Sequence, residues 1–79
     1  MARVLLFGPL RDLAGWRERQ IPSASLAELR SFLAAEDADL GAALAGPGVK
    51  AAVDQAIVLG DAPLAPASEV AFLPPMSGG

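Results

Sequence analysis

Short blocks of apolar and polar residues near the N-terminus indicate two strands. Apolar and β-branched side chains dominate residues 3–7, and Gly8-Pro9 follows them directly. Gly and Pro commonly end a strand in a turn, so the pattern predicts a first strand over residues 3–7. Residues 10–15 are expected to form a connection. Residues 16–21 are more polar, which is typical of a short second strand at the edge of a sheet.

A helix is indicated in the middle of the chain. Ser25 and Glu28 have the spacing of a capping box, in which side chains bond the free backbone N–H groups at a helix start. The apolar positions that follow recur every three or four residues, as on one helical face: Leu26, Leu29, Phe32 and Leu33. The pattern therefore predicts a helix over about residues 26–36.

Three acidic residues, Glu36, Asp37 and Asp39, lie at the end of this helix. Their residue types could ligate a metal ion, but a solvated helix end is the favoured interpretation. Asp37 or Asp39 is expected to cap a shorter helical piece, which residues 46–48 (Gly-Pro-Gly) end. We therefore expect no metal site and no bound cofactor in this chain.

The second half of the chain has the pattern of three strands. Residues 49–53 and 56–59 flank Asp54-Gln55, the spacing of a tight hairpin. After a further turn, Leu64 is expected to fill the core from a loop. Residues 69–73 form the last predicted strand, which the two following prolines end.

This order of elements predicts an α+β domain of the β-grasp (ubiquitin-like) type. We expect a mixed sheet of four to five strands, crossed by one main helix and accompanied by a short helical piece. The domain is expected to span residues 1–73, and residues 74–79 to form an extended Gly-Gly tail. The core is assigned to alternate residues of the first and last strands together with the apolar helix face: Val4, Leu6, Val70, Phe72, Leu26, Leu29, Phe32 and Leu33.

A single helix covers only one face of a sheet, so the opposite face is expected to carry an apolar patch. Phe7, Ile57 and Leu73 would form this patch, which is the kind of surface that marks a protein partner. The alternative is that loops or the second helical piece cover it. Arg11 is expected to be exposed, either as a contact for an acidic partner residue or as an ordinary solvated arginine.

Composition excludes most chemistry for this chain alone. Its 79 residues include no Cys and no His, which excludes disulfides, zinc-finger sites and Ser/His or Cys/His relays. The net charge is −3 and no basic stripe is present, so nucleic acid is not expected as a partner. No apolar run approaches the length of a membrane span, and we expect a cytoplasmic protein that does not bind membranes.

The last six residues, Pro74, Pro75, Met76, Ser77, Gly78 and Gly79, have no apolar period and are expected to project as an arm. The two prolines restrict the backbone to extended geometry. Gly78 and Gly79 lack side chains, so the terminal carboxylate of Gly79 could be threaded through a channel too narrow for a β-carbon. Terminal glycines are otherwise common as frayed ends. The favoured interpretation is a carboxylate that another enzyme activates.

Three segments of the chain resemble the small, sulfur-carrier subunits of molybdopterin synthase: residues 4–13, 51–55 and 69–79. The specific motifs are Phe-x-x-x-Arg-[Asp/Glu]-Leu, from Phe7 to Leu13, and Phe-x-Pro-Pro-x-[Ser/Thr]-Gly-Gly, from Phe72 to Gly79. Asp54 departs from the Asn that is usual there, and residues 67–69 (Ala-Ser-Glu) depart from a common Asp-Gly-Asp or Asp-Gly-Glu turn.

The resemblance implies a role as a protein cosubstrate, with the catalytic residues in its partners. An ATP-dependent adenylating (E1-like) enzyme would activate the Gly79 carboxylate, and a sulfur donor system would convert it to a thiocarboxylate. The tail would then enter the large synthase subunit, where the sulfur passes to cyclic pyranopterin monophosphate and two transfers build the dithiolene. Alternatives are a sulfur carrier for thiazole, cysteine or tRNA thiolation, a ubiquitin-like modifier, or a plain interaction module.

Overall fold

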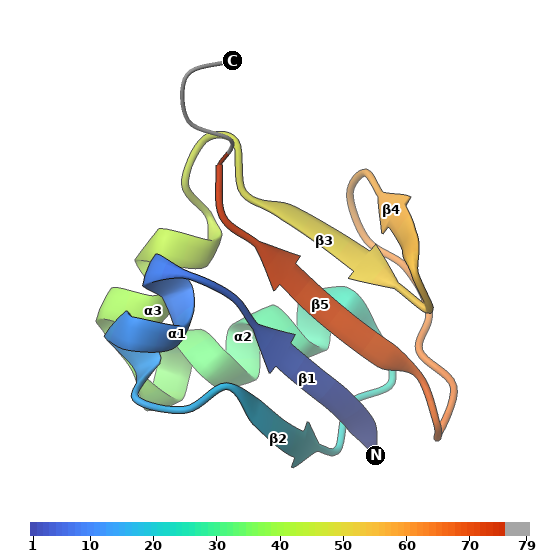
Figure 1. The fold of residues 1–79 in the computed structure, drawn as a ribbon. Helices are drawn as coiled ribbons and strands as arrows, with labels where there is room; N and C mark the ends of the chain where they lie inside the picture. Colours follow the sequence, from blue (N-terminus) through green and yellow to red (C-terminus); the bar gives the residue numbers. More distant parts are fainter. Residues whose placement is uncertain (76–79) are drawn as a thin grey trace.

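The computed structural model describes residues 1–75 and contains one five-stranded mixed sheet with three helices (Figure 1). The strand order is β2-β1-β5-β3-β4, in which β1 and β5 are parallel and the other neighbours antiparallel. The elements in chain order are β1 (Ala2–Leu6), α1 (Pro9–Ala14), β2 (Glu18–Ile21), α2 (Leu26–Glu36), α3 (Ala38–Leu44), β3 (Lys50–Val53), β4 (Ala56–Val58) and β5 (Glu69–Leu73). The predicted α+β, β-grasp arrangement is confirmed.

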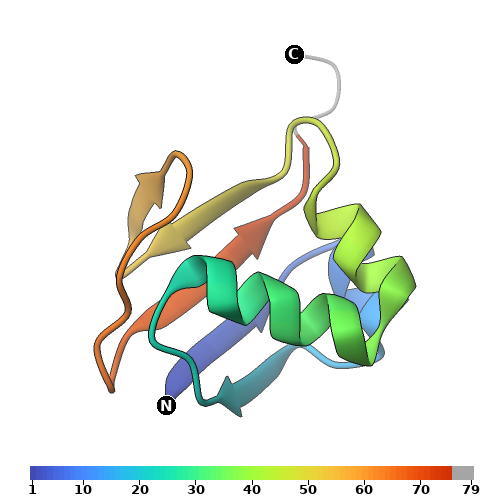
Figure 2. The ribbon, with the colours of Figure 1, turned by 180° about the vertical axis from the view of Figure 1, so that it is seen from behind.

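The helical layer lies on one face of the sheet. In Figure 1 α2 passes behind β1 and β5, and in Figure 2, which shows the molecule from behind, the same helix crosses in front of the strands. The largest fully buried side chains come from both layers: Phe72, Leu6, Ile21, Leu26, Leu29, Leu33, Leu40, Val4 and Val70. Leu64 is buried from its loop, as predicted. The opposite face of the sheet carries no helix among residues 1–75.

The helix α2 begins and ends where the periodicity predicts. The Ser25 hydroxyl accepts a hydrogen bond from the Glu28 N–H at 3.1 Å, as in a capping box. Phe32 is a wrong core assignment, because its side chain is 40% exposed. At 100° per residue it lies on the flank of the face that Leu29 and Leu33 present to the sheet, so the apolar period alone overestimates the width of that face.

The segment predicted as a connection, residues 10–15, contains the helix α1 instead. Pro9 stands in its first turn, where a fixed φ and a missing N–H cost nothing. Leu10 is buried in the core, and Gly15 ends the helix in the left-handed region at φ 82°. Its N–H donates to the carbonyl of Arg11 at 3.0 Å. This short helix is thus marked by one buried side chain, Leu10, and by Pro9 and Gly15 at its two ends.

The β3–β4 hairpin has the predicted two-residue loop. Asp54 and Gln55 have φ values of 49° and 71°, the left-handed pair that a type I′ turn requires. Asp54 and residues 67–69, which depart from the family pattern, bond each other beside this turn. Asp54 Oδ1 accepts from the Glu69 N–H at 3.0 Å, and the Ser68 hydroxyl donates to Asp54 Oδ2 at 3.4 Å. Asp37, one of two predicted caps, is the N-cap of α3.

Strand limits differ from the predictions by one or two residues at several ends. The first strand is Ala2–Leu6, the second is Glu18–Ile21, and the hairpin strands are Lys50–Val53 and Ala56–Val58. Terminal residues of strands depend on the last ladder hydrogen bond, which the alternation of side chains does not reveal. The last strand, Glu69–Leu73, is predicted correctly at both ends.

Candidate functional site

The parallel pairing of β1 and β5 determines where the tail leaves the domain. Both strands run toward the same edge of the sheet (Figure 1), and the register pairs Leu6, the last residue of β1, with Phe72 of β5. Phe7 and Leu73 directly follow this pair. Pro74 is half-buried at this edge and Pro75 is exposed. The predicted tail residues Met76, Ser77, Gly78 and Gly79 lie outside the described residues.

An apolar band crosses the open face of the sheet, the face without helices. Cross-strand pairing aligns one residue from each of four strands in a row: Leu5, Ala71, Ala52 and Ile57. Because side chains alternate along a strand, Leu73 points to this face as well. Ile57 is 50% exposed and Phe7, just beyond β1, is 44% exposed. The structure therefore leaves the predicted patch uncovered by loops or by α3 within residues 1–75.

A hollow of about 280 Å³ continues the band around the end of β1. It is lined by apolar and cationic side chains, together with one acid: Leu5, Leu6, Phe7, Arg11, Arg17 and Glu18. Arg11 is half-exposed, as predicted, and its Nε lies 3.6 Å from Asp12 Oδ1. Exposed pairs at such a distance are weak, so the guanidinium remains available to a carboxylate from a partner.

Lys50 adds a third cation on the other side of the tail exit. It pairs with Leu73 in the β3–β5 register and is exposed. Within residues 1–75 neither Lys50 nor Arg17 takes part in an ion pair. The exit of the tail is therefore bordered by apolar surface and by basic side chains, although the whole chain is acidic. Sequence reasoning missed Arg17 and Lys50, because only the sheet register brings them to this edge.

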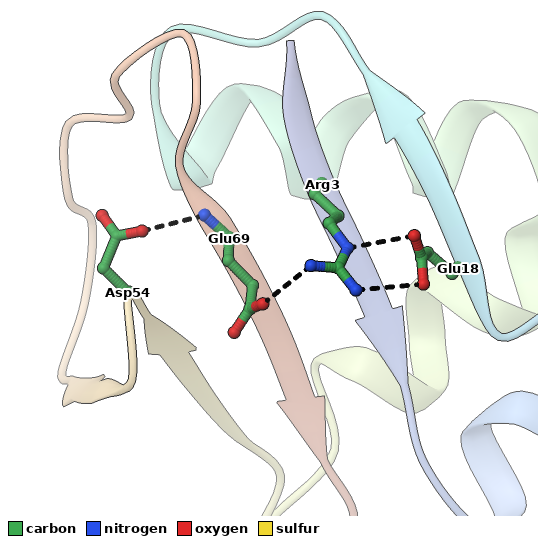
Figure 3. A network of polar contacts seen from close by, with 4 residues as sticks. All are labelled: Arg3, Glu18, Asp54 and Glu69. Atoms are coloured by element: carbon green, nitrogen blue, oxygen red, sulfur yellow. Dashed lines mark hydrogen bonds and ion pairs between the residues drawn. The ribbon is translucent and has the colours of Figure 1, made fainter.

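The far end of the open face is polar and satisfies its own charges (Figure 3). Arg3 Nε lies 3.0 Å from Glu18 Oε2, and its terminal nitrogens lie 3.3 Å from Glu18 Oε1 and 3.4 Å from Glu69 Oε1. The hydrogen bond between them, with the attraction of opposite charges, raises the pKa of Arg3 and lowers the pKa of Glu18. This network separates the apolar band from the opposite edge of the sheet.

A further ion pair joins the two layers away from this face. Arg19 on β2 bonds the carboxylate of Glu36 at the end of α2. This hydrogen bond lowers the pKa of Glu36 and raises that of Arg19. Glu36 therefore serves the fold, as Asp37 does by capping α3. Within the described part of the chain no three His, Cys, Asp or Glu side chains are grouped to hold a metal ion.

A larger hollow, of about 410 Å³, lies on the helical side between α2 and the loop after α3. Its one basic residue, Arg30, already donates to the carbonyl of Leu44 at 3.1 Å and lies over the ring of Phe72. No side chain in its lining is a nucleophile or a paired acid and base. The apolar band and the tail exit therefore form the better candidate site. Among residues 1–75 no helix is both long and apolar enough to cross a membrane.

The sheet order, the parallel pairing of the first and last strands and the single crossing helix define a β-grasp domain of the ubiquitin-like class. Comparison with known proteins agrees. Two solved structures of small archaeal modifier protein 1 share the fold: that from Methanosarcina acetivorans has a TM-score of 0.83 and 20% identity, covering 99% of this chain and 95% of that one. That from Haloferax volcanii has a TM-score of 0.80 and 18% identity, covering 99% and 98%.

Sequence comparison goes further than the fold. The ThiS family profile matches residues 4–79. The molybdopterin synthase sulfur carrier subunit of Escherichia coli (strain K12) is 36% identical over 81 aligned residues, which cover all of both chains. The chain belongs to the ThiS family.

Proposed function

We propose that this protein is the sulfur carrier of molybdenum cofactor biosynthesis and that its reactive group is the terminal carboxylate of Gly79. The observation that carries the proposal is the full-length match to a molybdopterin synthase sulfur carrier subunit. The ThiS match extends through residue 79 and so includes Gly78-Gly79. An apolar and basic surface beside the tail exit supports a role that depends on docking to other proteins.

The proposed chemistry proceeds in three steps. A carboxylate oxygen of Gly79 attacks the α-phosphorus of ATP in an adenylating (E1-like) partner, which displaces pyrophosphate and leaves an acyl adenylate. A nucleophile at the oxidation level of sulfide, supplied by the donor system, then displaces AMP, which gives the thiocarboxylate. In the large subunit of molybdopterin synthase the thiocarboxylate sulfur bonds to a carbon of cyclic pyranopterin monophosphate, and water cleaves the acyl–sulfur bond, which returns Gly79 to a carboxylate. Two such transfers complete the dithiolene. This chain carries the sulfur atom on Gly79, and its partners supply the catalytic residues.

The open face supplies the proposed docking surface. Phe7 and Leu73 offer apolar area at the edge from which the tail leaves, and Ile57 on β4 extends this area along the apolar band. Arg11, with the other cations at this edge, would attract and orient a partner whose surface is acidic around an apolar centre. Pro74 and Pro75, which restrict the backbone at the exit, would direct Met76, Ser77, Gly78 and Gly79 into the partner's active site.

Intact-mass measurement tests the proposal directly. The protein is incubated with its cognate adenylating enzyme, ATP and a sulfur donor, and the expected gain equals the replacement of one oxygen atom by sulfur. A chain that lacks Gly79 is the control and should gain nothing. If the whole chain also gains no sulfur, and cells that carry the control chain make normal amounts of the cofactor, the carrier proposal is wrong.

The pathway that receives the sulfur is tested separately. Purification of the protein from its own cells should recover a stable complex with the large synthase subunit. Co-purification with an enzyme of thiazole, cysteine or tRNA thiolation instead would assign the carrier to that pathway. A ladder of larger covalent conjugates, formed with ATP, would favour a ubiquitin-like modifier; the two archaeal proteins of the same fold are named as modifier proteins.

A further inference from the structure

The point at which the chain leaves the domain lies between two loops that each contribute a glycine. Gly8 stands between β1 and α1, and Gly48 stands between α3 and β3. A β-carbon built on Gly48 would lie 2.8 Å from Cβ of Pro75, and one built on Gly8 would lie 3.4 Å from Cγ of Pro74. The two prolines therefore pack where these loops carry no side chain.

The loop that contains Gly48 has a defined backbone geometry. The Val49 N–H donates to the carbonyl of Gly46 at 3.4 Å, and Gly48 has φ 82°. Pro47 at the second position and a positive φ at the third are the features of a type II turn, which favours glycine. The turn thus places a residue without a side chain directly against Pro75. A sequence reading sees Gly46-Pro47-Gly48 only as the end of a helix.

Contact at 2.8 Å leaves no room for a methyl group. A flexible side chain could rotate away from an alanine at position 48, but the Cβ of Pro75 belongs to a ring that includes the backbone nitrogen. Relief therefore requires that the backbone at Pro75 or the turn itself moves. Gly8 makes a looser contact with Pro74, and its backbone (φ 56°, ψ −133°) is a conformation that residues with a side chain avoid.

We propose that Gly8 and Gly48 form a seat for Pro74-Pro75, and that this seat sets the position and direction in which the chain leaves the domain. The inference rests on the proposed function, because its value to the protein is the productive presentation of the chain end to a partner. Four residues span at most about 14 Å when extended. A tilt of about 10° at Pro75 would therefore displace the far end of such a span by about 2 Å. The two glycines act as positioning residues.

Gly15 provides a matched control for Gly48. Both glycines have φ 82°, but a β-carbon on Gly15 would meet no atom within 4 Å. Gly48→Ala and Gly15→Ala therefore impose the same positive φ on alanine, and only the first intrudes on Pro75. The assay is the kinetics of thiocarboxylate formation with the cognate adenylating enzyme. Gly48→Ala should lose about tenfold or more in kcat/KM, mainly in kcat, because the docking face is unchanged. Gly15→Ala should stay within about twofold of the unsubstituted protein.

A rescue experiment separates the seat from a general loss of stability. Pro75→Gly removes the Cβ that an alanine at position 48 would meet. In that background Gly48→Ala should cost no more than Gly15→Ala does, and the difference is the coupling between positions 48 and 75. The proposal of a seat is wrong if Gly48→Ala and Gly15→Ala lose similar amounts of kcat/KM. It is also wrong if Gly48→Ala loses as much in the Pro75→Gly background as in the unsubstituted protein.

An NMR measurement tests the seat without any partner. The unsubstituted protein should show a nuclear Overhauser effect between the Hα protons of Gly48 and the ring protons of Pro75, and its absence overturns the proposal. If the contact is present but the unsubstituted protein never gains sulfur, the proposed function fails while the seat stands. The two proposals are therefore refuted by different results.

Discussion

The exposed ring of Phe7 gives the most direct test of where a partner docks. Its side chain is 44% exposed and borders the hollow that contains Arg11 and Arg17. A phenylalanine presents about 200 Å² of surface, so about 90 Å² remains for a partner to cover. At about 25 cal/mol per Å², this area contributes about 2 kcal/mol to binding. Phe7→Ala should therefore raise the Kd for the large synthase subunit about thirtyfold.

Phe32 is the matched control, because it is the same residue type with a similar exposure of 40% on the helical side. Phe7→Ala and Phe32→Ala remove the same group from two half-exposed positions, but only Phe7 borders the tail exit. Titration calorimetry with the purified large subunit should show the thirtyfold loss for Phe7→Ala and a change within about twofold for Phe32→Ala. An unchanged Kd for Phe7→Ala, or equal losses for the two variants, would refute the assignment of the docking surface.

Three further predictions concern the fold that carries this surface. Asp54→Ala should lower the free energy of unfolding in urea by about 1 kcal/mol, because the Glu69 N–H loses its acceptor. Asp54→Asn keeps an acceptor oxygen and should lower it less. Equal losses for the two variants would contradict this role of Asp54. Glu36→Gln should lower the Tm near neutral pH, because the Arg19 hydrogen bond holds the pKa of Glu36 below its ordinary value of 4.5. A lowered pKa in the folded state stabilises the fold above pH 4.5, and this stabilisation is lost as the pH falls through the folded-state pKa. The Tm difference should therefore shrink as the pH is lowered below 4.5, and a difference that does not shrink would refute the argument. Leu29→Ala, at a fully buried position, should cost about 2–5 kcal/mol by denaturant titration, and a loss below about 1 kcal/mol would contradict its place in the core.

The parts of the fold that sequence predicts well are those in which one period dominates. In β5 the burial alternates residue by residue, with Val70 and Phe72 buried, so the period of two identifies both the strand and its inner face. In α2 the Ser25 cap and the apolar period give the same helix start. The hairpin was predictable because Asp54 tolerates a positive φ and stands between two apolar runs.

The parts that sequence predicts poorly depend on contacts between distant segments. The helix α1 has only six residues, too few for an apolar period to show. Arg11, which borders the tail exit, lies within this short helix. Asp61 accepts from the Ala27 N–H at 2.8 Å and so caps α2 from a remote loop. The closeness of Gly48 to Pro75 follows from the packing of a loop against the end of β5. Turn signals identify such glycines as breaks, but they do not reveal what lies against them.

The two ends of the open face differ in how far their charges are already paired, and this difference bears on how a partner would dock. At the far end Arg3 bonds both Glu18 and Glu69, so a partner would have to replace existing contacts to gain new ones there. At the tail exit Arg17 and Lys50 have no ion-pair partner within residues 1–75, and exposed apolar area lies between them. Binding free energy is thus available mainly where the chain leaves the domain. A partner that binds this apolar and basic surface lies beside the tail exit. Docking of the partner and presentation of the chain end therefore depend on the same edge of the sheet.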